Sequence, residues 1–231
     1  MIGGAVVLRP EPGSARTAAL LTARGIDVRR CPLFAVTAVP WMTPDPRRFD
    51  ALLLTSVNAP RHAGEGLRTL ARLPVLAVGS ATAAAAKAAG LTIVLTGDRD
   101  AATLVAAAAA RGFTRLLHLA GRNRLTLPGV DQRTVYAAEP IAYPAGVAAS
   151  WTGRIALLHS PRAARRFAAL VAGAGVDRAA IAVAALSAAV AEAAGDGWSA
   201  VTRAATPTDA ALVAAAAALI DRAQGATDKR A

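Results

Sequence analysis

Short apolar segments alternate with alanine- and leucine-rich segments along the whole chain, and this alternation constrains the fold more than any other feature. Ala51–Thr55 and Ile155–His159 are typical of buried strands, because they are short and rich in leucine or isoleucine. Longer stretches between such segments, for example Asn58–Leu70 and Thr208–Ala223, are predicted to be helices. Strands that alternate with helices predict parallel sheets covered by helices on both faces.

The chain also carries an internal repeat of this pattern. Phe49–Gly64 resembles Gly153–Ala168, since a strand, a polar turn residue and a helix follow one another in both blocks. Two further pairs of blocks have nearly the same spacing, namely Ala77–Gly90 with Ala182–Gly195 and Asp100–Ala110 with Asp209–Leu219. The repeat predicts two similar α/β halves.

The repeat does not begin at the first residue, and this predicts that one domain is discontinuous. Residues 1–31 supply two strands and a helix that belong to neither copy. Arg115–Ala137 completes the first copy with two strands, and the second copy lacks such a segment after it. We therefore expect a discontinuous domain of residues 1–35 plus 148–231 and an inserted domain of residues 41–137.

The two segments that cross between these domains are expected to form a linker. Residues 31–40 and 137–147 are short, apolar and interrupted by proline. Two extended segments that run side by side can pair as an antiparallel ladder. The predicted fold class is therefore α/β, with two similar parallel-sheet domains joined by a two-stranded antiparallel linker.

The charge of the chain is high but dispersed. Its 231 residues include 26 Lys and Arg against 15 Asp and Glu, which gives a net charge of +11, and only 4% are aromatic. Nucleic-acid-binding proteins usually concentrate basic residues in a stripe or tail and add aromatic side chains for stacking. The charge is therefore expected to be a solvated background or to attract an anionic small molecule, with no nucleic-acid partner. No apolar run is long enough to span a bilayer and no signal peptide is recognisable, so we expect a cytoplasmic protein without a membrane partner.

Candidate ligand-binding residues follow the predicted strands. In parallel α/β sheets, ligands bind where the carboxyl ends of strands lead into helix N-termini. Small hydroxyl side chains beside free helix N–H groups suit a carboxylate or phosphate, although the same residues also serve as helix N-caps. The candidate residues at such positions are Arg9, Thr55, Ser56, Asn58, Gly79, Ser80, Thr82, Ser160, Arg162 and Ser187.

Several familiar catalytic and cofactor motifs are missing from the sequence. It has no G-x-G-x-x-G segment, no Walker loop and no G-x-S-x-G segment. A single cysteine, Cys31, excludes a disulfide framework and a cysteine-based zinc site, and the three histidines lack metal-ligand spacing. The residues alone therefore leave open a cofactor-free enzyme and a non-catalytic two-domain binding module for an anionic small molecule.

Several blocks in fixed order resemble one enzyme family over essentially the whole chain. They are LRPEPGSARTAALLTARG near the start, then CPLF, FDALLLTSVNAPRH and LAVGSATAAAA, and later VYAAEPI, IALLHSPRAARRF, IAVAALSAAVAEAA and GW followed by ATPTDAALVAA. The individual blocks are degenerate, but their order and spacing are similar to those of the uroporphyrinogen-III synthase family.

This resemblance implies a lyase of tetrapyrrole (haem) biosynthesis that needs no cofactor and no metal. The family cyclises hydroxymethylbilane to uroporphyrinogen III, with loss of water and inversion of the last pyrrole ring. Loss of the terminal hydroxyl leaves an azafulvenium-like cation, and attack by the substituted carbon of the last ring gives a spiro intermediate that recloses inverted. A monomer is expected by the same resemblance.

The resemblance also implies roles for particular residues. The recurrent tyrosine of the family corresponds to Tyr136, as a weak acid that assists water loss, although a purely packed tyrosine is the competing interpretation. The family's hydroxyl position corresponds to Thr82 and its repeat partner to Ser187. The substrate carries eight carboxylates, and Arg9 and Arg162 are expected to bind some of them. The chain departs from the commoner pattern at His159, where the first copy has Thr55, and at Pro60, near the start of a predicted helix.

Overall fold

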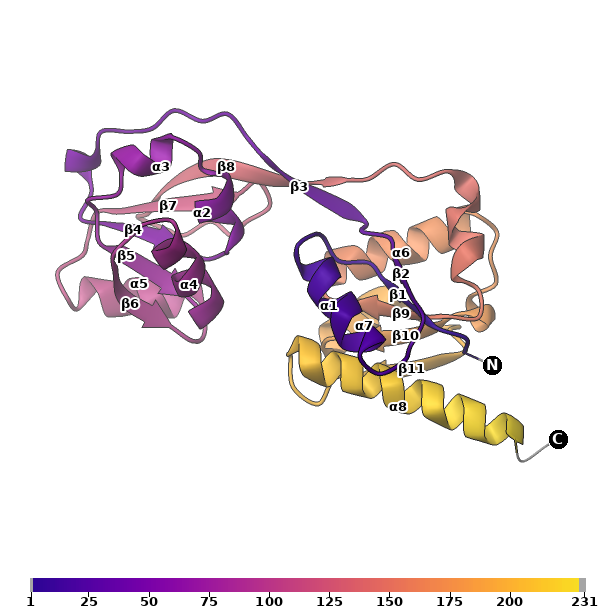
Figure 1. Ribbon diagram of the computed structural model, residues 1–231. Helices are drawn as coiled ribbons and strands as arrows, with labels where there is room; N and C mark the ends of the chain where they lie inside the picture. The colour runs from indigo at the N-terminus through magenta and orange to yellow at the C-terminus, as the bar shows by residue number, and fades with distance from the viewer. Residues whose placement is uncertain (1, 229–231) are drawn as a thin grey trace. The chain divides into compact units, whose positions relative to one another are not determined.

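The computed structural model describes residues 2–228, which fall into two compact units. Unit 1 comprises Met1–Ala35 and Pro140–Ala231, and unit 2 comprises Val36–Glu139. The predicted α/β fold with parallel sheets is confirmed, because each unit has a largely parallel sheet with helices packed on it (Figure 1). The first residue of the predicted segment 1–35 and the last three residues of the predicted segment 148–231 lie outside the described part of the chain.

The sheet of unit 1 has five strands in the order β11-β10-β9-β1-β2, and every neighbouring pair is parallel. The strands are β1 (Ala5–Val7), β2 (Val28–Arg30), β9 (Ile155–Leu158), β10 (Ala182–Ala185) and β11 (Ala200–Arg203). The helices are α1 (Gly13–Thr22), α6 (Pro161–Gly173), α7 (Ala188–Ala194) and α8 (Asp209–Asp228), with short 3-10 turns at Ala145–Trp151 and Arg178–Ala180. Helices α1 and α8 pack on one face of the sheet, and α6 and α7 pack on the other (Figure 1).

The sheet of unit 2 has the strand order β3-β8-β7-β4-β5-β6. Its strands are β3 (Phe34–Ala38), β4 (Ala51–Leu54), β5 (Val75–Val78), β6 (Ile93–Gly97), β7 (Leu116–Gly121) and β8 (Asp131–Pro140). Its helices are α2 (Asn58–His62), α3 (Gly66–Thr69), α4 (Ser80–Ala88) and α5 (Ala101–Ala109), after a 3-10 turn at Pro46–Arg48. The five strands from β8 to β6 are parallel to their neighbours.

The two sheets have the same order of corresponding strands. In unit 2 the consecutive strands β4, β5 and β6 lie side by side, and β7 and β8 continue the sheet beyond β4. In unit 1 the consecutive strands β9, β10 and β11 lie side by side, and β1 and β2 continue the sheet beyond β9. The first strands of the chain therefore take the place beside β9 that β7 and β8 take beside β4.

The central strands are apolar because both of their faces are covered. Every residue of β1, β4 and β9 is fully buried, as expected for parallel strands between two layers of helices. In unit 1, the ring of Phe167 on α6 lies between those of Trp151 and Trp198, with centroid distances of 5.4 and 4.9 Å. These three aromatic side chains pack α6 against the loops at the amino ends of the strands.

The predicted helix over Asn58–Leu70 is wrong in one respect, because it is broken into α2 and α3. Gly64 lies between them with a φ of +62°, a left-handed conformation that ends a helix.

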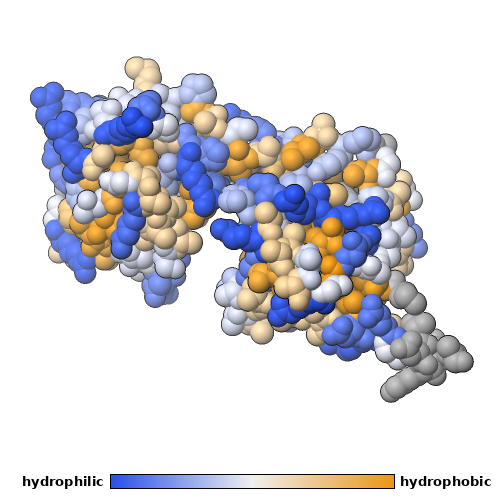
Figure 2. All heavy atoms as spheres, in the orientation of Figure 1, coloured by the Kyte–Doolittle hydropathy of each residue, from blue (hydrophilic) through white to orange (hydrophobic). Residues whose placement is uncertain are grey.

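No helix among residues 2–228 is both long and apolar enough to cross a membrane. Figure 2 shows hydrophilic side chains scattered over the visible face of both units, which is consistent with the dispersed charge.

The aromatic stack predicts that Phe167→Ala strongly destabilises unit 1. Removing a fully buried phenylalanine leaves a cavity and loses its contacts with both tryptophans, which costs about 3–5 kcal/mol of unfolding free energy. Urea unfolding followed by circular dichroism measures this loss. The control is Leu20→Ala on the exposed side of α1, which is expected to change the unfolding free energy by less than about 1 kcal/mol. Equal effects of the two substitutions would contradict the assignment.

Candidate functional site

A cavity of about 280 Å³ lies at the carboxyl ends of β4 and β7 in unit 2. This is the edge of a parallel sheet at which ligands bind in α/β proteins. Three of the predicted site residues, Thr55, Ser56 and Tyr136, line this unit 2 cavity together. The remaining lining residues are Ala101, His118, Ala120, Gly121, Asn123, Arg124, Leu125 and Leu127.

The position of Tyr136 depends on an irregularity in β8. The register between β7 and β8 shifts after Ala120, so that Tyr136 pairs with Gly121. A β-bulge of this kind redirects the side chain that follows it. A Cβ atom on Gly121 would lie 2.7 Å from two ring carbons of Tyr136, so only glycine leaves room for the ring. The half-buried phenol is thereby held in the wall of the unit 2 cavity.

His118 is a buried side chain in the same cavity. Its Nε2 atom lies 3.0 Å from the hydroxyl oxygen of Thr55, and its Nδ1 atom lies 3.5 Å from the amide nitrogen of Gln132. Burial lowers the pKa of His118 to about 4, with a smaller contribution from the positive charge of Arg124. The imidazole is therefore neutral at neutral pH.

Arg124 supplies the positive charge of the unit 2 cavity. Its Nη1 group donates to the carbonyl of Gly121 at 3.0 Å and to the hydroxyl of Thr134 at 2.7 Å, and its Nε–H donates to Gln132 at 3.0 Å. No carboxylate within residues 2–228 forms an ion pair with this guanidinium. An arginine fixed by neutral groups retains its charge for an anionic ligand.

The other predicted residues of unit 2 surround two helix N-termini. Ser56 accepts a hydrogen bond from the backbone N–H of Asn58 at 3.2 Å, which is a capping contact at the start of α2. Gly79 precedes α4 with a φ of +82° and open space where a side chain would stand. Ser80 begins α4, and Thr82 is buried in its first turn. None of Asn58, Gly79, Ser80 and Thr82 lines the unit 2 cavity as it stands.

In unit 1, Arg9 belongs to a cluster around Asp209. Arg9 forms an ion pair with Asp209 at 3.3 Å, and the hydroxyl of Thr17 donates to the same carboxylate at 2.9 Å. His159 Nε2 lies 2.9 Å from Asp209, and burial lowers the pKa of His159 against the effect of this contact. Arg9 thus has a carboxylate partner already, unlike Arg124.

The remaining predicted residues of unit 1 have local structural contacts. Ser160 caps α6, because its hydroxyl accepts from the backbone N–H of Ala163 at 3.2 Å. The guanidinium of Arg162 lies 4.3 Å from the ring centre of Phe34. Ser187 is the residue before α7 and makes no capping hydrogen bond with its side chain. That Ser160, Arg162 and Ser187 bind a ligand therefore stays a prediction.

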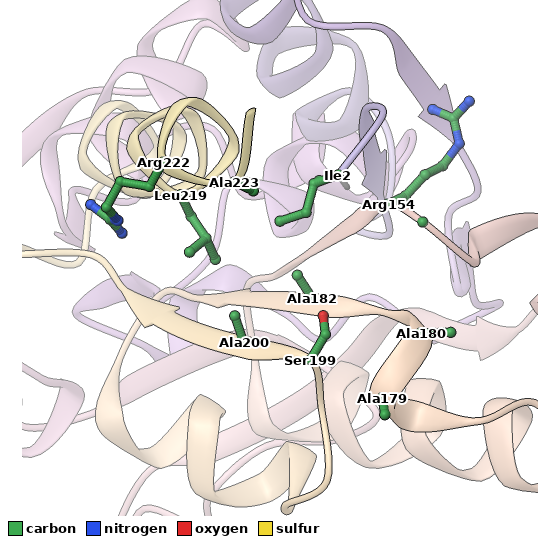
Figure 3. Close-up of a pocket in the computed structure, with 11 residues that line it drawn as sticks. Ile2, Arg154, Ala179, Ala180, Ala182, Ser199, Ala200, Leu219, Arg222 and Ala223 are labelled. Atoms are coloured by element: carbon green, nitrogen blue, oxygen red, sulfur yellow. The ribbon is translucent and has the colours of Figure 1, made fainter. Parts of the chain in front are cut away.

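A larger cavity of about 430 Å³ in unit 1 has a different character (Figure 3). It lies between α8 and the amino ends of β10 and β11, the edge opposite to the one where ligands bind in such sheets. In Figure 3 the alkyl side chains of Ile2 and Leu219 face it, whereas the guanidinium of Arg154 points away, and Asp27 pairs with that group at 2.7 Å. Besides Ser199 and Arg222, the rest of the lining is mainly alanine and alkyl side chains. The unit 2 cavity, at the edge of the sheet where ligands bind, is therefore the better candidate site.

His118, Arg124 and Gln132 are not among the site residues predicted from the sequence. Arg124 follows a strand, so the rule that selected Arg9 would also have found it. A histidine within the apolar segment LLHLAG is a further signal, since a buried polar side chain needs a partner. Gln132 gives no such signal, because its role depends on the pairing of β7 with β8.

Comparisons with known proteins relate the chain to one family. The model of the family described as "Uroporphyrinogen-III synthase HemD" matches residues 15–214. The solved uroporphyrinogen-III synthetase of Helicobacter pylori is 14% identical, with a TM-score of 0.64, and the match covers 94% of this chain and 99% of that one. A mutant uroporphyrinogen III synthase of Thermus thermophilus is 17% identical, with a TM-score of 0.53 and coverage of 96% and 99%. A search of curated proteins finds no match. At these identities the structural likeness establishes a shared fold.

The lowered pKa of His118 predicts that the folded state loses stability in mild acid. Between about pH 6.5 and pH 4 the unfolded chain binds a proton at this histidine and the folded chain does not, so the contribution of His118 to stability falls as the pH falls through this range and is constant below it. The full loss amounts to about 2–4 kcal/mol. Urea unfolding at several pH values measures it. His118→Asn is expected to reduce the dependence but not abolish it, because burial also lowers the pKa of His159. A variant as acid-sensitive as the unaltered protein would refute the assignment.

Proposed function

Because the chain belongs to the uroporphyrinogen-III synthase family, we propose that the unit 2 cavity holds the reacting end of its substrate. The chain is a cyclising lyase of tetrapyrrole biosynthesis, which converts hydroxymethylbilane into uroporphyrinogen III with loss of water and inversion of the last pyrrole ring. The family match over residues 15–214 is the observation that carries this function. The geometry supports a proposal for the residues that perform it.

Tyr136 is the proposed acid. The pyrrole nitrogens of the substrate supply the electrons that expel the terminal hydroxyl, so the protein needs only a weak acid near the departing oxygen. The phenol gives its proton to this oxygen as the carbon–oxygen bond breaks, and water leaves. The proton released when the last ring becomes aromatic again restores the phenol. The position of the Tyr136 ring against Gly121, in the cavity wall, supports this role.

Arg124 and the hydroxyl groups of Thr55 and Ser56 are the proposed partners of a substrate carboxylate. Arg124 has no acidic partner among residues 2–228, and because its Nε and Nη1 hydrogens already bind neutral groups, its Nη2 group is the one that can donate a charge-assisted hydrogen bond to a carboxylate. The volume of about 280 Å³ is near the lower end for small-molecule sites, so the cavity suits one pyrrole ring with its side chains rather than the whole tetrapyrrole. Holding that ring in a fixed orientation favours the inverted closure.

The other predicted site residues are proposed to bind the remaining carboxylates of the substrate. Free N–H groups at the start of α4 support this role for Gly79, Ser80 and Thr82, because helix N-termini attract anions. Arg9 would have to exchange Asp209 for a substrate carboxylate. The residues concerned are Asn58, Gly79, Ser80 and Thr82 in unit 2 and Arg9, Ser160, Arg162 and Ser187 in unit 1.

The finer features predicted from the sequence also remain proposals. The segments 31–40 and 137–147 are proposed to form a two-stranded antiparallel linker. Support comes from two hydrogen bonds, from the N–H of Val39 to the carbonyl of Val135 at 3.0 Å and from the N–H of Ile141 to the carbonyl of Leu33 at 3.1 Å. In this pair of bonds the residue numbers rise in one segment as they fall in the other, which is the pattern of antiparallel pairing. A cytoplasmic location and a monomeric state stay predictions.

The activity is expected to produce a single isomer. Freshly made hydroxymethylbilane closes without enzyme to the type I isomer, so the products are oxidised and separated by isomer after incubation with the protein. Uroporphyrin III above the type I background is the expected result, with heat-denatured protein as the control. Type I product alone would favour the alternative of a non-catalytic binding module, which the family match does not support.

The proposed acid predicts that Tyr136→Phe lowers kcat by about 100-fold and changes KM little, because the hydroxyl acts mainly in the transition state. Steady-state kinetics of type III formation measure both constants. The matched control is Tyr143→Phe, which removes the other tyrosine hydroxyl of the chain and its hydrogen bond to the carbonyl of Pro32. The control is expected to keep its kcat. An unchanged kcat in Tyr136→Phe would leave Tyr136 with a packing role only.

A further inference from the structure

A chain of hydrogen bonds leads from Arg124 through Gln132 and His118 to Thr55 in the unit 2 cavity. We infer that Gln132 and His118 are positioning residues that fix the hydroxyl of Thr55 as a hydrogen-bond donor directed to the substrate. The inference rests on the proposed function of the cavity, and it adds two residues that do not themselves have to touch the substrate.

The donor-to-acceptor direction of these hydrogen bonds follows from Arg124, because a guanidinium can only donate hydrogen bonds. Its Nε–H lies 3.0 Å from the side-chain oxygen of Gln132, which must accept. The amide nitrogen of Gln132 then faces the other way, 3.5 Å from Nδ1 of His118 and 3.4 Å from the carbonyl of Leu125. Both of these neighbours can accept, so the orientation of the amide is consistent with every contact it makes.

The amide of Gln132 in turn selects the tautomer of His118. A neutral imidazole has one nitrogen that donates and one that accepts. Since Nδ1 accepts from Gln132, the proton lies on Nε2, which is 3.0 Å from the hydroxyl oxygen of Thr55. Burial lowers the pKa of His118, so at neutral pH the ring is neutral and carries a proton on one nitrogen only.

The hydroxyl of Thr55 therefore receives a hydrogen bond and keeps its own hydrogen. Thr55 lines the cavity, so the hydrogen is available to a group bound there. With the opposite tautomer, Thr55 would have to donate to His118 and would present only lone pairs, which repel a carboxylate. The Thr55 hydroxyl therefore favours a bound group that accepts a hydrogen bond, which is either a substrate carboxylate or the departing hydroxyl.

The corresponding position of unit 1 has a different arrangement. His159 stands where the first copy of the repeat has Thr55, and its Nε2 atom contacts the carboxylate of Asp209 at 2.9 Å. That contact ends on an acidic group that already pairs with Arg9. The series of hydrogen bonds that ends on a hydroxyl group is therefore found in the unit 2 cavity and not at the corresponding position of unit 1.

The tautomer can be tested without any activity measurement. A ¹⁵N-detected NMR spectrum of the histidine side chains, assigned with His118→Asn, is expected to show His118 protonated on Nε2 at neutral pH. Gln132→Leu removes the donor to Nδ1 and is expected to give a mixture of the two tautomers. A proton on Nδ1 in the unaltered protein, or a spectrum that Gln132→Leu leaves unchanged, would overturn the inference.

Kinetics test whether the directed hydroxyl serves the substrate. His118→Leu removes the donor to Thr55, whereas His118→Gln keeps an amide N–H that can take its place. We expect His118→Leu to lower kcat/KM about tenfold, the loss of roughly one hydrogen bond to a charged group, and His118→Gln to recover most of it. Thermal unfolding of both variants checks that they fold.

The same substitutions in a Thr55→Val background complete the test. Without the threonine hydroxyl, His118→Leu is expected to cause no further loss of kcat/KM, because the two residues act as one unit. A full additional loss, or equal effects of leucine and glutamine, would show that His118 does not act through Thr55. If Thr55→Val itself keeps full activity, the proposed role of Thr55 in the cavity is wrong, whereas the NMR result still reports the tautomer.

Discussion

The central strands of both sheets are covered by helices on both faces, and this constraint decides where polar side chains can lie along those strands. Strands such as β1, β4 and β9 have no solvent-facing side, so a polar side chain along them would be buried without water. Along these strands, polar residues are therefore found at the ends, where loops and helix N-termini offer partners. His118 is the exception within β7, and it is tolerated because Thr55 and Gln132 contact both of its nitrogens.

A second constraint acts between β7 and β8. The bulge in β8 changes which residues pair with the end of β7, and Gly121 leaves space for an aromatic ring there. Either feature without the other would place Tyr136 elsewhere: a regular strand would shift its pairing, and a side chain at residue 121 would occupy the space of the ring. The candidate acid is thus positioned by backbone geometry rather than by hydrogen bonds of its own.

Much of the fold could be predicted from the sequence, because alternation and repetition are local patterns. They indicated parallel sheets and two similar halves, and the rule about strand ends selected Thr55 and Ser56. Other features depend on contacts between distant segments and could not be predicted in this way. The partner of Arg9 is Asp209, at the other end of the chain, and the role of Gln132 depends on the register of β8. The break at Gly64 was missed although the glycines at residues 64 and 66 disfavour a continuous helix.

The place of β1 in its sheet has a consequence for the order in which the protein forms during synthesis. β1 lies between β2 and β9, and β9 begins at residue 155, so β1 has a partner on one side only until residues 155–158 have been made. All the strands of the other sheet precede β9 in the chain and can pair before it is made. Unit 2 can therefore fold first during synthesis. The sheet of unit 1 stays incomplete until β9 has been made and can pair with β1.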